Sequence, residues 1–93
     1  DLERNIFTAY ADAKGAMETY LATKEMLKAR EEAFRYTKTR FENGMATAFD
    51  YNQSQTLLVN TQSDLLRTKY DYLFRSKILE FYFGIPIIQR NYN

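Results

Sequence analysis

The sequence contains no cysteine, no histidine and no tryptophan. The absence of cysteine and histidine excludes disulfides, thiol chemistry, Cys/His metal sites and the commonest general base. A cysteine-free sequence is compatible with any redox compartment, so this absence does not locate the protein. No uncharged apolar run approaches the roughly 18 residues that a membrane-spanning helix needs, and no signal peptide is visible. Asp1 is not a translation start, so we expect a mature product or an excised fragment.

Residues that break helices are scarce: 93 residues contain one proline, Pro86, and three glycines, at positions 15, 44 and 84. This distribution favours unusually long helices and leaves little room for loops or strands. The apolar fraction of 45% and the charged fraction of 27% are those of a folded chain rather than a disordered one. At this length we expect one small domain. The net charge of +1 argues neither for nor against an acidic partner.

Residues 2–42 carry a heptad row, in which apolar or small side chains recur every seven residues. The row consists of Ile6, Ala13, Tyr20, Leu27, Phe34 and Phe41. A flanking row adds Leu2, Ala9, Tyr10, Ala16 and Met17, and turns polar toward residue 42. This spacing predicts a helix packed on a partner helix, with a buried stripe that is broad at its start and narrow at its end. A glycine in mid-helix, such as Gly15, lowers the stability of the helix by about 1 kcal/mol relative to alanine. Close packing of another helix is one possible reason for a glycine at this position.

Residues 48–83 carry a second pattern of the same kind. Its main heptad row consists of Tyr51, Leu58, Leu65, Tyr72 and Leu79, and a second apolar row consists of Val59, Leu66 and Leu73. From Tyr70 onward the apolar residues surround the whole helix, which predicts neighbours on more than one side. We therefore expect the chain to self-associate, or to be completed by a part of the protein outside this sequence.

One short stretch separates the two patterns. Gly44 can adopt the left-handed conformation that closes a helix at its C′ position. Thr47 can serve as the N-cap of the next helix, with Asp50 three residues on as the acid of a capping box. Stop and start signals this close together predict a tight turn between antiparallel helices.

The predicted fold is all-α: a single long antiparallel two-helix coiled-coil hairpin over residues 1–93 with a tight turn at Gly44–Thr47. Its parts are a helix over about 2–42, a turn over 43–47, a helix over about 48–83 and an extended tail over 84–93. The second helix is expected to end at Gly84, because a glycine there can close it and Pro86 prevents its resumption.

Nothing in the sequence predicts an enzyme, a cofactor or a metal site. There is no glycine-rich phosphate loop and no nucleophile–base arrangement. Charged pairs such as Asp71 and Arg75 have the i,i+4 spacing that supports an exposed helix by a few tenths of a kcal/mol. The basic residues are interleaved with acids and form no single stripe, so nucleic-acid binding is not expected.

The stretch from Arg40 to Gly84 resembles the TolC-type outer-membrane efflux protein family. The residues that carry the resemblance include Arg40, Phe41, Gly44, Thr47, Asp50, Tyr51, Gln53, Gln55, Leu58, Asn60, Gln62, Leu65, Lys69, Tyr70, Asp71, Tyr72, Leu73, Leu79, Tyr82 and Gly84. They are similar to the aromatic-x-x-Gly-x-x-Thr-x-x-Asp pattern at the periplasmic end of the family's hairpins. They are also similar to the spacing of Leu, Gln and Tyr-Asp-Tyr that follows this pattern. The first helix agrees with the family more loosely.

The resemblance implies a trimeric channel of Gram-negative bacteria for drug efflux or type I secretion. In that family each protomer holds two structural repeats, its strands form a β-barrel in the outer membrane, and its helices form a tunnel through the periplasm. A periplasmic adaptor joins the tunnel to an inner-membrane pump, giving a tripartite assembly. This chain would be one periplasmic hairpin, of the C-terminal repeat because Gly84-Ile85-Pro86-Ile87 resembles the exit from the family's last helix. It would contact the outer membrane only through segments outside this sequence.

Carried over residue by residue, the resemblance implies two sites. The adaptor-docking tip would consist of Asn43, Gly44, Met45, Ala46 and Thr47. Asp50 matches the acid that faces the tunnel near its closed end, so Asp50 and Gln53 would line a constriction, and three copies of Asp50 would form an acidic ring that favours cations. Ala46 stands where some members place a basic gating residue, and Gln53 where they place a second acid. A gate latched by salt bridges at these positions is therefore not expected.

A second interpretation is a free-standing coiled-coil interaction module, such as the hairpin of an adaptor protein. The two interpretations differ in what should flank the hairpin in the whole protein. Alternating strands would favour the channel, and a lipoyl-like β domain would favour the adaptor.

Overall fold

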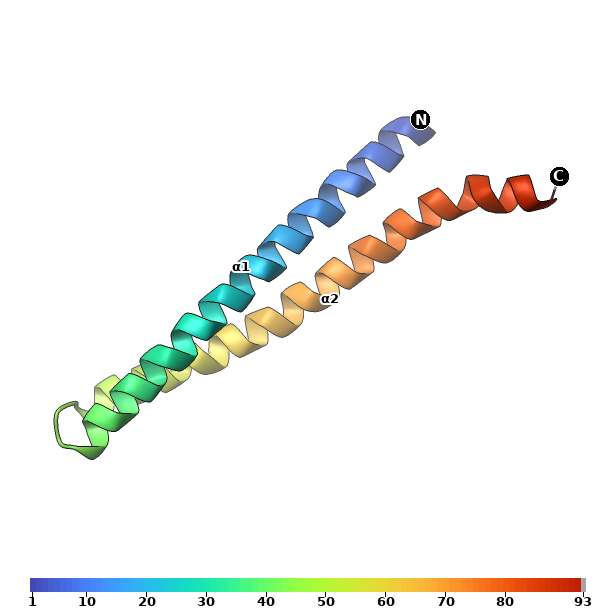
Figure 1. Cartoon of the computed structure of the whole chain (residues 1–93). Helices are drawn as coiled ribbons and strands as arrows, with labels where there is room; N and C mark the ends of the chain where they lie inside the picture. Colours follow the sequence, from blue (N-terminus) through green and yellow to red (C-terminus); the bar gives the residue numbers. More distant parts are fainter. Residues whose placement is uncertain (93) are drawn as a thin grey trace. The chain divides into compact units, whose positions relative to one another are not determined.

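The computed structural model describes the backbone of residues 1–92 and the side chains of residues 1–84. Two helices account for almost all of the described chain: α1 (Leu2–Glu42, 41 residues) and α2 (Ala48–Tyr92, 45 residues) (Figure 1). The part of the chain that is described contains no strand. The all-α prediction of a hairpin of two long helices with a tight turn is therefore confirmed, as are the bounds of the first helix.

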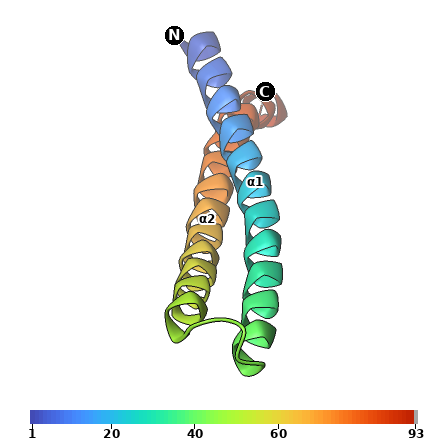
Figure 2. The ribbon, with the colours of Figure 1, turned by 90° about the vertical axis from the view of Figure 1, so that its left-hand side faces the viewer.

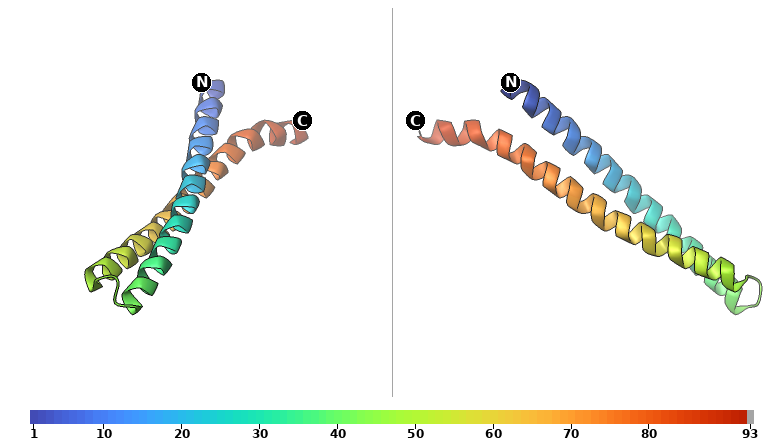
Figure 3. Two further views of the ribbon diagram at one scale, coloured as in Figure 1. Left: turned by 60° about the vertical axis from the view of Figure 1, so that its left-hand side comes forward. Right: turned by 180° about the vertical axis from the view of Figure 1, so that it is seen from behind.

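The chain divides into two units, which we treat separately. The tip unit is Leu21–Arg67 and contains the turn; the terminal unit combines Asp1–Tyr20 with Thr68–Asn93. In the tip unit the ring of Tyr51 on α2 packs on two rings of α1, with its centroid 5.0 Å from that of Phe41 and 5.4 Å from that of Phe34. The green connection in Figures 2 and 3 links the two helices, which run antiparallel on either side of it.

In the terminal unit α1 packs on α2 largely through alanine. Among the described side chains of this unit, the buried apolar ones are those of Ala9, Ala13 and Ala16. The rings of Tyr20 and Tyr72 stack across the two helices, with centroids 6.0 Å apart and 12° between their planes. The contact between the helices of this unit therefore includes small buried side chains and one pair of stacked aromatic rings.

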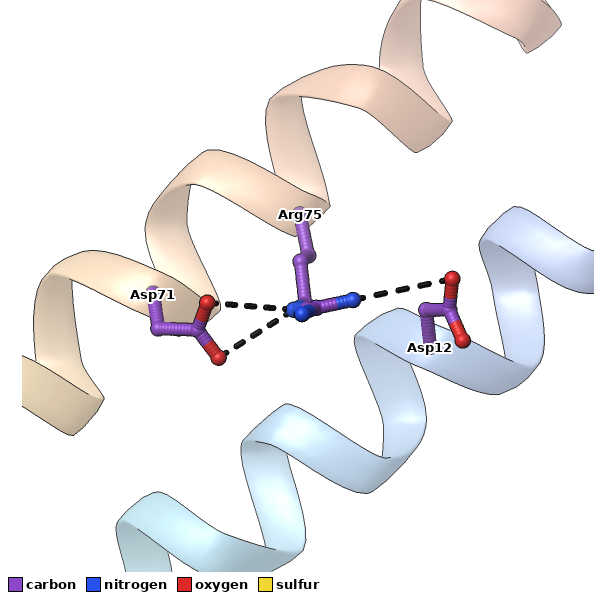
Figure 4. A network of polar contacts seen from close by, with 3 residues as sticks. All are labelled: Asp12, Asp71 and Arg75. Atoms are coloured by element: carbon purple, nitrogen blue, oxygen red, sulfur yellow. Dashed lines mark hydrogen bonds and ion pairs between the residues drawn. The ribbon is translucent and has the colours of Figure 1, made fainter.

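An ion network also joins the two helices of the terminal unit (Figure 4). The Nε of Arg75 donates to both carboxylate oxygens of Asp71, each at 3.1 Å, as the i,i+4 spacing predicted. The Nη1 of the same guanidinium lies 3.6 Å from Oδ2 of Asp12 on α1. Arg75 therefore connects a local helical pair to the opposite helix, and all three side chains are 42–52% exposed.

The main heptad rows form the interface between the helices, as predicted. Every described member of both rows is buried or half-buried except Phe41, which is 39% exposed. The second apolar row on α2 lies outside this interface, because Val59, Leu66 and Leu73 are 51%, 55% and 43% exposed.

Small hydroxyl side chains complete the α2 side of the interface instead: Ser54, Thr61 and Thr68. Each follows a main-row residue by three positions, which places it on the same side of the helix. Thr61 is 4% exposed, and its hydroxyl donates to the Leu57 carbonyl at 2.8 Å. A threonine that satisfies its hydroxyl on its own helix can be buried like an apolar residue, which leaves the larger aliphatic row outside.

The buried stripe of α1 also differs from the expectation. Ala9 and Ala16 are buried, but the larger members of the flanking row, Leu2, Tyr10 and Met17, are 36–52% exposed. The stripe is therefore not broad at the start of the helix. A Cβ added at Gly15 would meet no atom within 4 Å, so no described segment of this chain packs closely there.

The predicted end of α2 near residue 83 and the extended tail from residue 84 were wrong, because α2 continues to Tyr92. A glycine closes a helix by taking a positive φ. Among the described glycines only Gly44 does so, whereas Gly84 remains within the helix. Pro86 lacks an N–H and so removes one backbone hydrogen bond, which α2 tolerates. Residue 93 lies outside the described residues.

Much of the apolar surface has no neighbour within the hairpin. No large side chain among those described is fully buried. Between residues 70 and 84 the large exposed apolar side chains are Tyr70, Leu73, Phe74, Ile78, Phe81 and Phe83. Neither helix, over its described length, has a stretch long and apolar enough to cross a membrane.

Candidate docking tip

The C-terminus of α1 is closed by a Schellman motif. Gly44 has a φ of +74°. Its N–H donates to the Phe41 carbonyl at 3.1 Å, and the N–H of Met45 donates to the Arg40 carbonyl at 2.7 Å. These are the two hydrogen bonds that satisfy the last carbonyls of a helix when a left-handed residue follows it. The predicted C′ role of Gly44 is confirmed.

The N-terminus of α2 is closed by a reciprocal capping box. The Asp50 N–H donates to Oγ1 of Thr47 at 3.1 Å, and the Thr47 N–H donates to Oδ2 of Asp50 at 3.2 Å. Two amide groups that the first turn of a helix leaves without partners are thus satisfied by two side chains. The predicted roles of Thr47 and Asp50 in capping are confirmed.

Arg40 binds the turn from the α1 side. Its Nη2 donates to the Met45 carbonyl at 3.0 Å, and its Nη1 donates to the Tyr36 hydroxyl at 3.1 Å. The guanidinium carbon lies 5.5 Å from the centroid of the Tyr36 ring, within the range of a cation–π contact. The sequence reasoning used Arg40 only as part of a motif. The i,i+4 spacing of Tyr36 and Arg40 was the signal that could have indicated this contact.

The predicted tip residues differ in what they present to solvent. Met45 is 69% exposed, and Phe49 in the first turn of α2 is 72% exposed. Asn43 folds back, with its Nδ2 donating to the Thr39 carbonyl at 2.9 Å. Ala46 is half-buried. The turn therefore uses its polar groups internally and directs its largest apolar side chains outward.

Asp50 and Gln53, the predicted constriction residues, share one groove beside the turn. The groove has a volume of about 360 Å³ and is lined by Tyr36, Thr37, Arg40, Ala46, Asp50, Gln53, Ser54 and Leu57. Both residues are exposed. A neighbouring groove of about 340 Å³ is lined by Phe49, Asn52, Gln53, Thr56 and Leu57. Within the described side chains no group of acidic residues is arranged to hold a metal ion.

The turn is thus closed by hydrogen bonds within it, and its two largest apolar side chains, Met45 and Phe49, are exposed. The model of the outer membrane efflux protein family matches residues 1–84, which cover α1, the turn and most of α2. The chain belongs to the outer membrane efflux protein family. Comparison with curated proteins and with solved structures gave no match.

Membership of the outer membrane efflux protein family confirms the TolC-type resemblance and makes the chain part of an outer-membrane efflux channel component. The family is one of non-enzymatic transport components. Its match also favours the channel over the adaptor hairpin as the source of this chain.

Proposed function

We propose that this chain is a periplasmic tunnel hairpin of a trimeric outer-membrane channel for drug efflux or type I secretion, and that its tip docks a periplasmic adaptor. The adaptor joins the channel to an inner-membrane pump. The hairpin comes from the C-terminal repeat and needs no cofactor. The family match over residues 1–84 supports the channel, and the closed turn at Gly44–Thr47 is the observation that supports docking.

The exposed apolar side chains support the assembly into a tunnel. Val59 and Leu66 on α2 lie outside the hairpin interface at 51% and 55% exposure. Monomeric soluble proteins rarely expose large contiguous apolar surface, so a row of this kind indicates a protein neighbour. In a trimer of hairpin-bearing protomers, adjacent helices would supply that neighbour.

Within the assembled tunnel, Asp50 and Gln53 form the constriction. Their position in one groove next to the turn supports this role, because both lie near the end of the hairpin that would close the tunnel. Three copies of Asp50 favour cations at that point. Ala46 carries no charge, so the closed state does not depend on a salt bridge at that position.

Cysteine cross-linking in the full-length channel tests the docking role. The chain contains no cysteine, so a single cysteine introduced at Ala46 reports on the tip alone. We expect the A46C variant to cross-link to the adaptor in cells, and the matched variant Ser63→Cys, exposed on α2 away from the turn, to give no such product. Mass spectrometry identifies the captured protein.

Gly44→Trp provides the functional arm of the same test. Its φ of +74° is strained for any side chain other than glycine, so the variant distorts the tip without touching the tunnel wall. We expect reduced export of a fluorescent dye and reduced cross-linking from position 46. Unchanged export and unchanged cross-linking would remove the docking role.

A further inference from the structure

We propose that the tip binds its partner through two apolar side chains, Met45 and Phe49, and that Arg40 is the residue that positions Met45. This inference rests on the proposed docking function and specifies its chemistry. The partner surface is an apolar one at the end of the adaptor, presenting aliphatic or aromatic side chains. Charge pairing contributes little to the contact.

Two of the three charged side chains of the tip already make hydrogen bonds within the turn. Between residues 40 and 50 the charged side chains are those of Arg40, Glu42 and Asp50. The Arg40 guanidinium binds the Met45 carbonyl and the Tyr36 hydroxyl, and the Asp50 carboxylate accepts the Thr47 N–H. Glu42 lies two residues beyond Arg40, about 200° around α1, so it projects from the other side of the helix. Both charged groups that face the turn are thus held in place by hydrogen bonds within it.

The backbone of the turn is engaged in the same way. The N–H groups of Gly44, Met45 and Thr47 and the carbonyl of Met45 all have partners within the turn. What the turn presents to a partner is therefore mainly apolar: Met45 at 69% exposure and Phe49 at 72%. Methionine and aromatic side chains are enriched in the cores of protein–protein interfaces.

A groove beside Phe49 provides a receiving surface for the partner. It is lined by Phe49, Asn52, Gln53, Thr56 and Leu57, has a volume of about 340 Å³, and carries no charged side chain. Leu57 at its wall is 38% exposed. Met45 and Phe49 thus project toward the partner, and the groove next to Phe49 accepts an apolar side chain in return.

Arg40 fixes the position of Met45 from two directions. Its backbone carbonyl accepts the Met45 N–H at 2.7 Å, and its guanidinium donates to the Met45 carbonyl at 3.0 Å. The Tyr36 hydroxyl and ring hold the same guanidinium in place. Lysine keeps the charge but has no planar fork that reaches both oxygens, so Arg40→Lys should loosen Met45 without removing the charge.

The experiment measures the affinity of the detergent-solubilised full-length channel for the purified adaptor captured by the A46C variant. We expect Met45→Ala and Phe49→Ala each to weaken binding by about fivefold or more, the effect of truncating a residue central to an interface. The matched control is Met26→Ala, which removes an exposed methionine of the tip unit away from the turn.

Raising the salt from 50 to 500 mM should change the affinity by less than about threefold, because no charge pair crosses the interface.

A double-mutant cycle distinguishes positioning from a general effect on stability. If Arg40 acts through Met45, then Arg40→Lys weakens binding by itself but adds nothing to Met45→Ala. Arg35→Lys, an exposed arginine on the same helix, serves as its control. Independent, additive losses would contradict the positioning role of Arg40.

The outcomes separate this inference from the proposed function. If the unmodified channel does not bind the adaptor, the docking function itself fails. If it binds, but Met45→Ala and Phe49→Ala bind as tightly as Met26→Ala, the tip docks by other contacts and the apolar inference is wrong. A steep loss of affinity with salt would likewise overturn it in favour of charge pairing.

Discussion

The turn and the interface between the helices are stabilised in opposite ways. In the turn, short hydrogen bonds within eleven residues satisfy the backbone: the Schellman motif, the capping box and the contacts of Arg40. Along the helix interface the contacts are between residues far apart in sequence, and no large described side chain is fully buried. The hydrogen bonds of the turn are made within this chain, whereas many apolar side chains on the helix faces stay exposed.

This difference shows which part of the hairpin depends on neighbours. A capped turn keeps its geometry wherever the chain is placed, because its partners are local. The helix faces gain stability only when another surface covers their exposed aliphatic side chains. Full burial of one aliphatic side chain contributes about 1.5–3 kcal/mol, and Val59 and Leu66 are already about half covered, so covering the rest of both contributes roughly 1.5–3 kcal/mol in total, more than a typical single hydrogen bond of the turn.

Val59→Gln combined with Leu66→Gln should therefore have the largest effect, and on association rather than on the fold of the hairpin. Both side chains are about half exposed, so the hairpin loses little when they become polar. The isolated chain is expected to self-associate through its exposed faces, and the double variant should weaken that association by more than about tenfold. Sedimentation velocity over a range of concentrations measures the change.

Glu25→Gln combined with Glu32→Gln is the matched control, because these exposed residues also lie on the outer side of a helix but are not apolar. This control should leave the association unchanged. A strictly monomeric unmodified chain at high concentration would show that the exposed rows do not need neighbours, and the contrast with the turn would no longer hold.

Gly44→Val tests the turn, and its effect should be smaller and confined to folding. A branched side chain in the left-handed region costs about 1–2 kcal/mol, although a Cβ at Gly44 would meet no atom within 4 Å. Gly15→Ala is the opposite case: it lies within α1 in open space, so alanine should stabilise the chain by up to about 1 kcal/mol. Thermal unfolding followed by circular dichroism at one fixed concentration measures both. Equal shifts for the two variants would show that backbone conformation does not control stability here.

The features that depend on neighbouring residues could be predicted from the sequence. Gly44, Thr47 and Asp50 each act on groups within four positions, so their identity and spacing determine the geometry. The main heptad rows were also predictable, because aliphatic and aromatic residues recur at one spacing. The family resemblance rested on the same stretch, and the family match confirms it.

The features that depend on the pairing of the two helices could not be predicted in this way. Val59 and Leu66 are more apolar than Thr61 and Thr68, yet the threonines are buried, because a hydroxyl bonded to its own helix fits a close interface. The prediction that α2 ends at Gly84 was wrong for a different reason. Glycine permits a helix end without requiring one, and α2 continues through Gly84. At the candidate site, the contact of Arg40 with the Met45 carbonyl could not be predicted, because it depends on the backbone conformation of the turn.

The pair of Asp12 and Arg75 gives the smallest effect and the sharpest test of how the helix interface differs from local contacts. Nη1 of Arg75 and Oδ2 of Asp12 are 3.6 Å apart across the two helices, and both side chains are about half exposed (Figure 4). A double-mutant cycle with Asp12→Asn and Arg75→Gln should give a coupling of roughly 0.2–1 kcal/mol at low salt that falls toward zero at 1 M. The pair of Lys77 and Glu80, at 3.4 Å on α2 alone, is the control and should give less, because it joins no second helix. A coupling above about 2 kcal/mol, or one that salt leaves unchanged, would mean that the neighbourhood of Arg75 is shielded from water in solution. Chemical denaturation of the four variants of each cycle, at matched concentration, supplies both values.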